Sequence, residues 1–218
     1  SYAISKYADV ITFLPYAQTD SSTNEKLLEI GCKAYINLKR SEEKFTMLDE
    51  GFIKYPNNEF FFATIIKEYN GINNYEKSLI YARKMTELYP NIRRYWYIRG
   101  KQEQLIEDYD SAIISFTNAI KLQTDDAESY SSLGDIYKIK AYNFDNDSII
   151  GDISLSENKS LFKKNRDKLN NLYKLSMYNY ELAKKYAENN TKLWLTGLKE
   201  AYYNLNMGEE LKKLEKYK

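Results

Sequence analysis

A period of 34 residues constrains the fold of this chain more than any other feature of its sequence. The tripeptide Tyr-Pro-Asn occurs at 55–57 and again at 89–91, which is 34 residues later. Around these prolines, apolar residues recur at the three- to four-residue spacing of amphipathic helices. A period of this length indicates stacked helix pairs, because each pair leaves an apolar face that only a neighbouring pair can cover.

The stretch 93–126 shows the pattern most clearly. Trp96 and Gly100 lie on one face of its first predicted helix, and Ala112, Phe116 and Ala119 recur at helical spacing on the second. Two antiparallel helices approach closely where a small residue of one meets a large residue of the other. These residues therefore predict a tightly packed helix pair.

On these residues the stretch resembles a tetratricopeptide repeat (TPR), whose 34-residue unit carries an aromatic residue and a glycine on its first helix and a small–aromatic–small pattern on its second. Thr124 stands where the family usually has proline. Steps of 34 residues give three gapless units, 25–58, 59–92 and 93–126. The resemblance implies an all-α fold, a right-handed α-solenoid of antiparallel helix pairs, and a non-enzymatic binding scaffold.

The two ends of the chain depart from the simple repeat. Residues 1–24 are predicted to form an N-terminal helical cap or partial repeat, with the helical pattern broken before Pro15. A fourth unit, 127–190, has Gly134 at the expected position of its first helix. The pattern of its second helix resumes only at Tyr180 and Ala183, so about 30 residues are inserted between the two helices. We expect a loop at 143–158 and a long protruding helix at 160–186. Residues 191–218 are predicted to form an incomplete fifth repeat or C-terminal cap.

Composition argues against several classes of function. The 32 basic and 31 acidic residues nearly cancel, so no bulk attraction to nucleic acid is expected. Histidine is absent, and no nucleophile–base pair or phosphate loop is present. A pattern that begins like a calcium-binding loop occurs at Asp145, Asn146 and Asp147. Its later positions lack the oxygen ligand, the glycine and the final glutamate that an EF-hand loop requires. We therefore expect no catalytic residue, no cofactor, no metal, no nucleic-acid partner and no membrane span.

Some residues depart from the family pattern. Lys44 and Arg99 occupy positions where the family prefers small or apolar residues, and we expect their stems to pack while their charges reach water. Cys32 takes the position of Gly100 two 34-residue units earlier, which predicts a buried structural thiol. Of the residues matching the two-carboxylate clamp of chaperone-binding TPR domains only Arg94 fits, so a chaperone-tail partner is not supported.

A candidate binding face follows from the repeat. Lys33, Lys67 and Lys101 occupy the same first-helix position, which in the resembled family faces the concave groove; Asp135 interrupts this row and Lys199 restores it. The candidate partner-binding residues are Lys33, Lys67, Arg94, Tyr97, Lys101, Lys199 and Tyr202. Such a face predicts an acidic protein or peptide partner. The alternative is that these lysines are ordinary solvated residues.

A second functional class stays open at this point. The array can instead be a structural or self-associating segment of a larger envelope assembly, and the oligomeric state is not determined. The closing stretch 194–215 resembles the C-terminal end of bacterial, often exported, TPR proteins. The first residue is Ser1 rather than methionine, so either a leader was removed or the sequence was trimmed. The resemblance of the closing stretch favours an exported, periplasmic protein whose leader was removed, with a cytoplasmic protein as the alternative.

Overall fold

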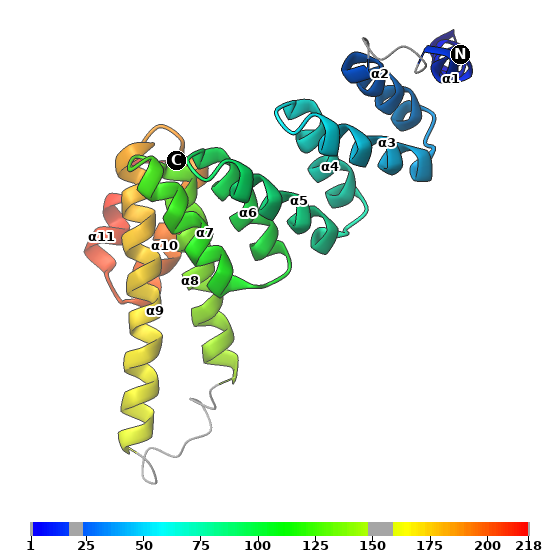
Figure 1. Cartoon of the computed structure of the whole chain (residues 1–218). Coiled ribbons are helices and arrows are strands. Elements are labelled where there is room, and N and C mark those ends of the chain that lie inside the picture. Colours follow the sequence, from blue (N-terminus) through cyan, green and yellow to red (C-terminus); the bar gives the residue numbers. More distant parts are fainter. Residues whose placement is uncertain (1, 18–23, 148–158, 218) are drawn as a thin grey trace. The chain divides into compact units, whose positions relative to one another are not determined.

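The computed structural model describes residues 2–17, 24–147 and 159–217 (Figure 1). In these ranges the chain forms eleven α-helices and one short 3-10 helix, with no strand. The all-α class predicted from the sequence is confirmed. The chain divides into two compact units, residues 1–81 and 82–218, and the division falls within α5 (Tyr75–Leu88).

The first unit is a series of helices that each pack on the next. It contains α1 (Tyr2–Ala17), α2 (Asn24–Asn37), α3 (Ser41–Lys54) and α4 (Glu59–Gly71), with contacts between successive helices. Its core side chains are almost fully buried and include Leu28, Cys32, Leu48, Phe52, Phe61, Phe62 and Ile65. Cys32 is buried as predicted, and burial raises the pKa of its thiol to about 12.

Helix α1 does not end where the sequence pattern suggested. It continues through Pro15 to Ala17. A proline inside a helix removes the hydrogen bond from its own nitrogen and crowds the preceding turn. The packing of α1 along α2 offsets this cost, because it buries residues such as Leu14.

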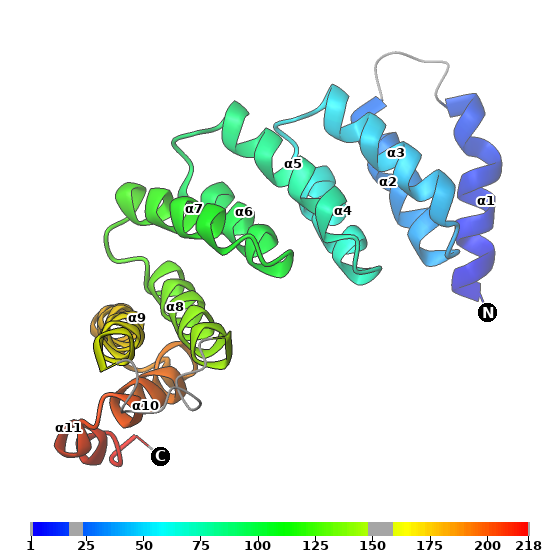
Figure 2. The same cartoon turned by 90° about the horizontal axis from the view of Figure 1, so that it is seen from below.

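The second unit holds the remaining helix pairs. It contains α6 (Arg93–Leu105), α7 (Tyr109–Leu122), α8 (Ala127–Asp147), α9 (Lys159–Tyr186), the 3-10 helix η1 (Thr191–Leu193), α10 (Leu195–Asn204) and α11 (Gly208–Lys213). Figure 2 shows α8, α9 and α10 grouped together. One core cluster surrounds Phe116 and Ile136, and another surrounds Tyr180 and Trp194.

Small residues face aromatic rings in both pairs of this unit. A Cβ atom on Gly100 would lie 2.8 Å from the ring of Phe116, and one on Gly134 would lie 2.9 Å from the ring of Tyr180. Ala119 and Ala183 are fully buried. The contact predicted between Gly100 and Phe116 is present, and Tyr180 makes the equivalent contact with Gly134 despite the inserted residues.

The turns inside the pairs share one backbone conformation. Lys39, Asn73 and Glu107 have φ angles of 58°, 56° and 62°, and each lies between the two helices of its pair. Asn206 repeats this feature before α11, with a φ of 57°. A single left-handed residue lets the chain leave the first helix and reverse its direction.

The insertion lengthens both helices of the fourth pair. Helices α8 and α9 run side by side well beyond the other helices of their unit (Figure 1). Residues 143–147 of the predicted loop are helical instead, and residues 148–158 lie outside the described part of the chain. The helix continues because its distal side chains pack on α9: Ala141 is fully buried, and the Lys168 ammonium lies 4.2 Å from the Phe144 ring centroid. The long helix predicted at 160–186 is present as α9, paired with α8 rather than isolated.

Two charged residues at unusual repeat positions are paired inside the structure. Lys44 is buried, and its Nζ lies 2.8 Å from Oε2 of Glu68. Arg99 donates from Nε to the fully buried Glu103 at 2.9 Å. The expectation that the Lys44 charge reaches water is therefore wrong, because a carboxylate from the next pair lies within hydrogen-bond distance.

Candidate partner-binding faces

The candidate lysines fall in both units, each on the first helix of its pair. Lys33 on α2 and Lys67 on α4 belong to the first unit, and Lys101 on α6 and Lys199 on α10 to the second. Each unit therefore carries two of the four candidate lysines.

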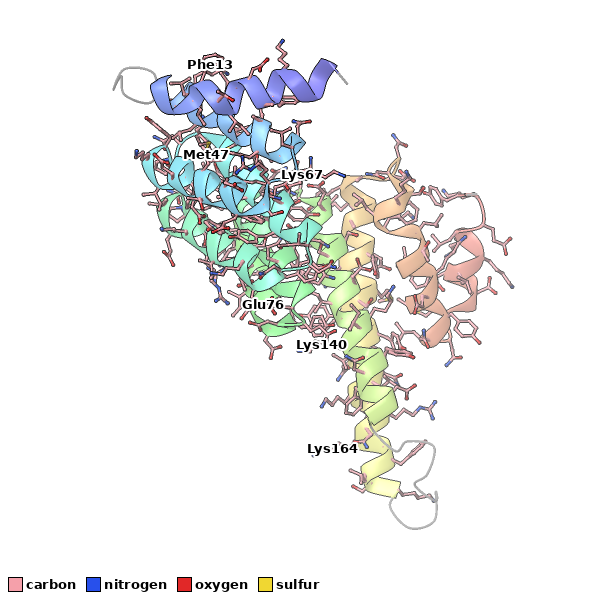
Figure 3. The ribbon with its side chains drawn as sticks, turned by 90° about the vertical axis from the view of Figure 1, so that its right-hand side faces the viewer. Phe13, Met47, Lys67, Glu76, Lys140 and Lys164 are labelled. Atoms are coloured by element: carbon pink, nitrogen blue, oxygen red, sulfur yellow. The ribbon has the colours of Figure 1, made fainter. Side chains whose placement is uncertain are left out.

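In the first unit the two lysines differ in their surroundings. The half-exposed Lys33 has its Nζ 3.5 Å from Oε2 of Glu29 and 4.7 Å from the ring centroid of Phe60. A hydrogen bond from Asn58 holds the pKa of Glu29 below its usual range, so this carboxylate stays charged beside Lys33. Lys67 is exposed (Figure 3) and forms no ion pair with any residue that the structure describes. Lys67 is thus the more accessible charge.

A groove between α1 and α2 adjoins Lys33. Its volume is about 290 Å³, and it is lined by Lys6, Tyr7, Val10, Ile30 and Lys33. The lining combines apolar side chains with two cations. The repeat pattern missed this groove because α1 lies before the first complete unit, where no 34-residue step assigns its residues to a face.

In the second unit the candidate residues on α6 are partly covered. Lys101 is half-buried and donates to Oε1 of Gln104 at 2.9 Å. Burial lowers the pKa of Lys101, and the negative charge of Asp135 partly offsets this shift. The ring of Tyr97 lies 5.8 Å from that of Phe116, with the Arg93 guanidinium 5.0 Å away. Lys101 and Tyr97 are therefore both only partly accessible to a partner.

The adjacent faces of α8 and α10 carry both signs of charge. Asp135 accepts a hydrogen bond from the Tyr180 hydroxyl at 2.6 Å. The Lys138 ammonium lies 3.8 Å from this Asp135 carboxylate and 3.3 Å from that of Glu200. Lys199 is half-buried beside these pairs, whereas Arg94 on α6 is exposed. The lysines of this unit therefore stand among carboxylates.

Tyr202 does not belong to an exposed face. It is 7% exposed, packs with Trp194 and Leu198, and donates to Oε1 of Glu181 at 2.9 Å. Its assignment to the binding face is wrong, because Trp194, Leu198 and Tyr202 follow one another at four-residue steps and form the buried stripe of this segment. That spacing is readable in the sequence. The neighbouring Tyr203 points away from this stripe and is 73% exposed.

Comparison with known proteins gives structural matches only. The sequence matches no family model and no curated protein. The crystal structure of a MamA protein superposes with a TM-score of 0.64 over 89% of both chains, at 15% identity. A putative protein binding protein from Bacteroides ovatus gives 0.54 over 97% of this chain and 98% of that one, at 16% identity. A TPR repeats protein from Bacteroides fragilis gives 0.52 over 92% and 89%, at 14% identity.

This chain has the tetratricopeptide-repeat fold. The α-solenoid class inferred from the 34-residue period is confirmed. At these low identities the likeness shows the fold alone. The two Bacteroides proteins come from bacteria.

Among the described residues, no three His, Cys, Asp or Glu side chains gather closely enough to hold a metal ion. Asp145, from the calcium-loop-like pattern, belongs to helix α8. In the same ranges no helix has the length and apolar composition needed to cross a bilayer.

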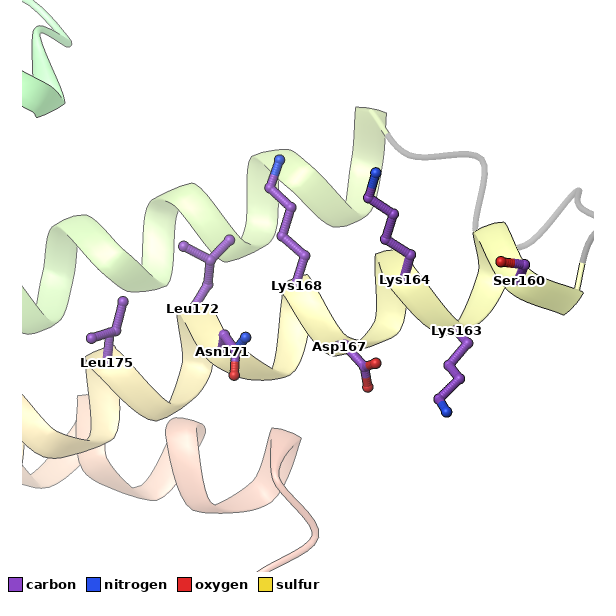
Figure 4. Close-up of a pocket in the computed structure, with 8 residues that line it drawn as sticks. All are labelled: Ser160, Lys163, Lys164, Asp167, Lys168, Asn171, Leu172 and Leu175. Carbon is purple, nitrogen blue, oxygen red and sulfur yellow. The ribbon is translucent and has the colours of Figure 1, made fainter.

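A second groove lies on α9, a helix that carries none of the candidate lysines. Its volume is about 470 Å³. Its lining residues all come from α9 and are Ser160, Lys163, Lys164, Asp167, Lys168, Asn171, Leu172 and Leu175 (Figure 4). The repeat pattern assigned no role to these residues because they belong to the insertion.

Proposed function

We propose that this TPR chain is a non-enzymatic scaffold that binds an acidic protein or peptide segment on the faces of its first helices. The fold supports the general function, because stacked helix pairs present extended surfaces for partners. The observation that carries the finer proposal is the groove between α1 and α2, where Lys6 and Lys33 accompany an apolar lining.

The groove suits a segment with one apolar side chain beside carboxylates. Tyr7, Val10 and Ile30 can remove an apolar side chain from water, which is the main source of affinity at an interface. The two lysines can pair with carboxylates at its edge, where ion pairs contribute more to partner selection than to affinity. The exposed Lys67 extends the positive charge of this unit.

The second unit contributes less to this proposal. Lys101 is half-buried with a lowered pKa, and Lys138 is already shared by Asp135 and Glu200. An incoming acidic segment would have to compete with these carboxylates. The surface remaining for a partner is offered by Arg94, Tyr97, Lys199 and the exposed Tyr203.

The test uses an acidic peptide of glutamates with one central leucine, measured by fluorescence anisotropy at several salt concentrations. We expect binding that weakens as salt rises, because exposed charges are screened over about 10 Å at 0.1 M salt. The variant K6E/K33E should lose binding, whereas K77E/K192E, with the same change of net charge at two other exposed lysines, should retain it. Equal loss in both variants, or binding insensitive to salt, would contradict the proposal.

The alternative function, a self-associating segment of a larger assembly, is favoured by Phe13. This aromatic side chain on α1 is largely exposed, and exposed apolar groups are often covered by a partner. Sedimentation of the chain at increasing concentration tests the alternative. A dimer that dissociates in the variant F13D would support self-association, whereas a monomer at all concentrations would exclude it.

A further inference from the structure

The outer surface of α9 carries a stripe of exposed residues at heptad spacing. Successive members are three or four residues apart, which keeps them on one side of a helix. We call this set the α9 stripe, and it consists of Leu161, Lys164, Lys168, Asn171, Leu175 and Tyr178, all exposed. At about 1.5 Å per residue it extends roughly 26 Å along the helix.

The α9 stripe is separate from the side of α9 that forms the core. Tyr173, Ser176 and Tyr180 are buried on the opposite side, where Ser176 donates to the carbonyl oxygen of Gly134 on α8 at 2.9 Å. In contrast, Leu161 is 41% exposed, Leu175 42% and Tyr178 57%. The groove of about 470 Å³ runs along the stripe at Lys164, Lys168 and Leu175 (Figure 4). The α9 helix therefore has one packed side and one exposed side, on which apolar residues at both ends flank lysines and an asparagine.

The same part of α9 carries concentrated positive charge. The cations of residues 159–174 are Lys159, Lys163, Lys164, Arg166, Lys168 and Lys174, against the single carboxylate Asp167, although the whole chain has a net charge of only +1. None of these six forms an ion pair with a residue in the described ranges. Lys168 has the Phe144 ring as its neighbour. Residues 159–174 thus carry five more cations than carboxylates.

We propose that the α9 stripe binds an amphipathic helix of another protein, which carries apolar residues opposite Leu161, Leu175 and Tyr178 and acidic residues opposite Lys164 and Lys168. Heptad spacing is the geometry by which helices pack side by side, and polar residues within such a stripe fix the register of the partner. This surface is separate from the groove between α1 and α2 and does not depend on the function proposed for that groove.

The arrangement of the α9 stripe favours this partner over three others. A second copy pairing through the same stripe would bring together two segments that each carry six cations and one carboxylate, so the two copies would repel each other. A helix that lies on a membrane has a broad apolar face with cations at its edges, whereas here the lysines stand between the apolar residues. A nucleic acid would gain nothing from the exposed leucines and would meet Asp167 beside the groove.

The experiment uses two synthetic helical peptides of about 20 residues, matched to the length of the stripe. Both have leucine at the heptad positions except at the two positions opposite Lys164 and Lys168. One peptide has glutamate there and the other has lysine. Binding to the full chain is measured by isothermal titration calorimetry. We expect the glutamate peptide to bind and the lysine peptide to bind at least about tenfold more weakly, because two attractive charge pairs become repulsive.

Variants of the chain complete the charge exchange. K164E/K168E should reverse the preference, so that the lysine peptide binds more tightly. R166E/K174E makes the same change of net charge at two exposed residues outside the stripe and its groove, and it should leave the preference for glutamate unchanged. L161A/L175A should weaken both peptides, with circular dichroism checking that the helices remain.

Several results would overturn the proposal. These are no binding of the glutamate peptide at about 1 mM, no reversal in K164E/K168E, or an equal effect of R166E/K174E. Vesicles of phosphatidylglycerol and a single-stranded oligonucleotide serve as competing probes. If either probe binds the natural chain and R166E/K174E but not K164E/K168E, and the peptide does not bind, the stripe would be assigned to a membrane or a nucleic acid. A dimer abolished by K164E/K168E would assign it to a second copy.

Discussion

The pairs α6–α7 and α8–α9 use the same packing contact on very different lengths of chain. In each, a glycine of the first helix faces an aromatic ring of the second, Gly100 against Phe116 and Gly134 against Tyr180. The helices of the first pair have 13 and 14 residues, and those of the second 21 and 28. The contact near the base of the pair is retained because loop closure depends only weakly on the number of residues between its ends. An insertion can therefore add a new surface without altering the repeat beneath it.

The largest expected effect comes from breaking this shared contact. Gly100→Leu and Gly134→Leu should each lower the free energy of unfolding by about 1–3 kcal/mol or more, because the new side chain must displace an aromatic ring that is tightly packed. Chemical denaturation monitored by circular dichroism measures the change. Gly71→Leu is the matched control, since a Cβ at Gly71 meets no atom within 4 Å. Unchanged denaturation midpoints in both variants would contradict the packing described here.

Replacing Tyr180 with Phe gives the α8–α9 pair the same glycine–phenylalanine contact that Gly100 and Phe116 form in the α6–α7 pair. Burial and the neighbouring Asp135 raise the pKa of Tyr180 above its usual value. Tyr180→Phe removes the hydroxyl that donates to Asp135 and should cost about 1 kcal/mol at neutral pH.

The same substitution should change the response to alkali. The unfolded chain ionises at Tyr180 above about pH 10, whereas the folded chain keeps the hydroxyl protonated. The folded form then binds the extra proton, so the stability of the natural chain falls as pH rises. Tyr180→Phe lacks this pH-dependent loss of stability. The difference in free energy of unfolding between the natural chain and the variant should therefore shrink above pH 10. Denaturation midpoints between pH 7 and 11 measure it, and a constant difference would contradict the role of Tyr180.

A smaller effect is expected at the turn of the α6–α7 pair. Glu107 has a φ of 62°, which is unfavourable for a residue with a Cβ atom. Glu107→Gly should raise the free energy of unfolding by about 0.5–1 kcal/mol, as relief of the left-handed strain exceeds the added freedom of glycine in the unfolded state. Asn73→Gly, at the equivalent turn of the preceding pair, should raise the free energy of unfolding by less, because asparagine tolerates the left-handed conformation better than glutamate does. Thermal unfolding of both variants tests the order, and an equal or larger gain at Asn73 would contradict it.

The smallest effect should come from shortening the insertion. Replacing residues 145–164 with a short Gly-Ser turn removes the distal ends of α8 and α9 but leaves Gly134 and Tyr180 in contact. We expect the free energy of unfolding to change by less than about 1 kcal/mol, since loop length carries little entropy and the contacts at the base remain. Calorimetric unfolding measures this. A large loss would mean that the distal helices stabilise the repeats as well as each other.

The sequence by itself determined the repeated part of the fold. The 34-residue period, the small and aromatic positions of 93–126 and the buried Cys32 were readable because they depend on local helical periodicity and on side-chain volume. The return of the pattern at Tyr180 and Ala183 was readable for the same reason. Packing at these positions repeats from one pair to the next, so one well-defined unit is enough to predict its neighbours.

Only the tertiary structure decided how the charged and surface residues are used. Lys44 is buried because Glu68 of the next pair reaches it, and Lys101 is half-buried among residues distant in sequence. Whether residues 143–147 continue α8 depends on α9 packing beside them, and the exposed side of α9 is defined by what α8 and α10 leave uncovered. The burial and pairing of a charge depend on neighbours from other helices, and the order of residues along the chain does not reveal which helices become neighbours.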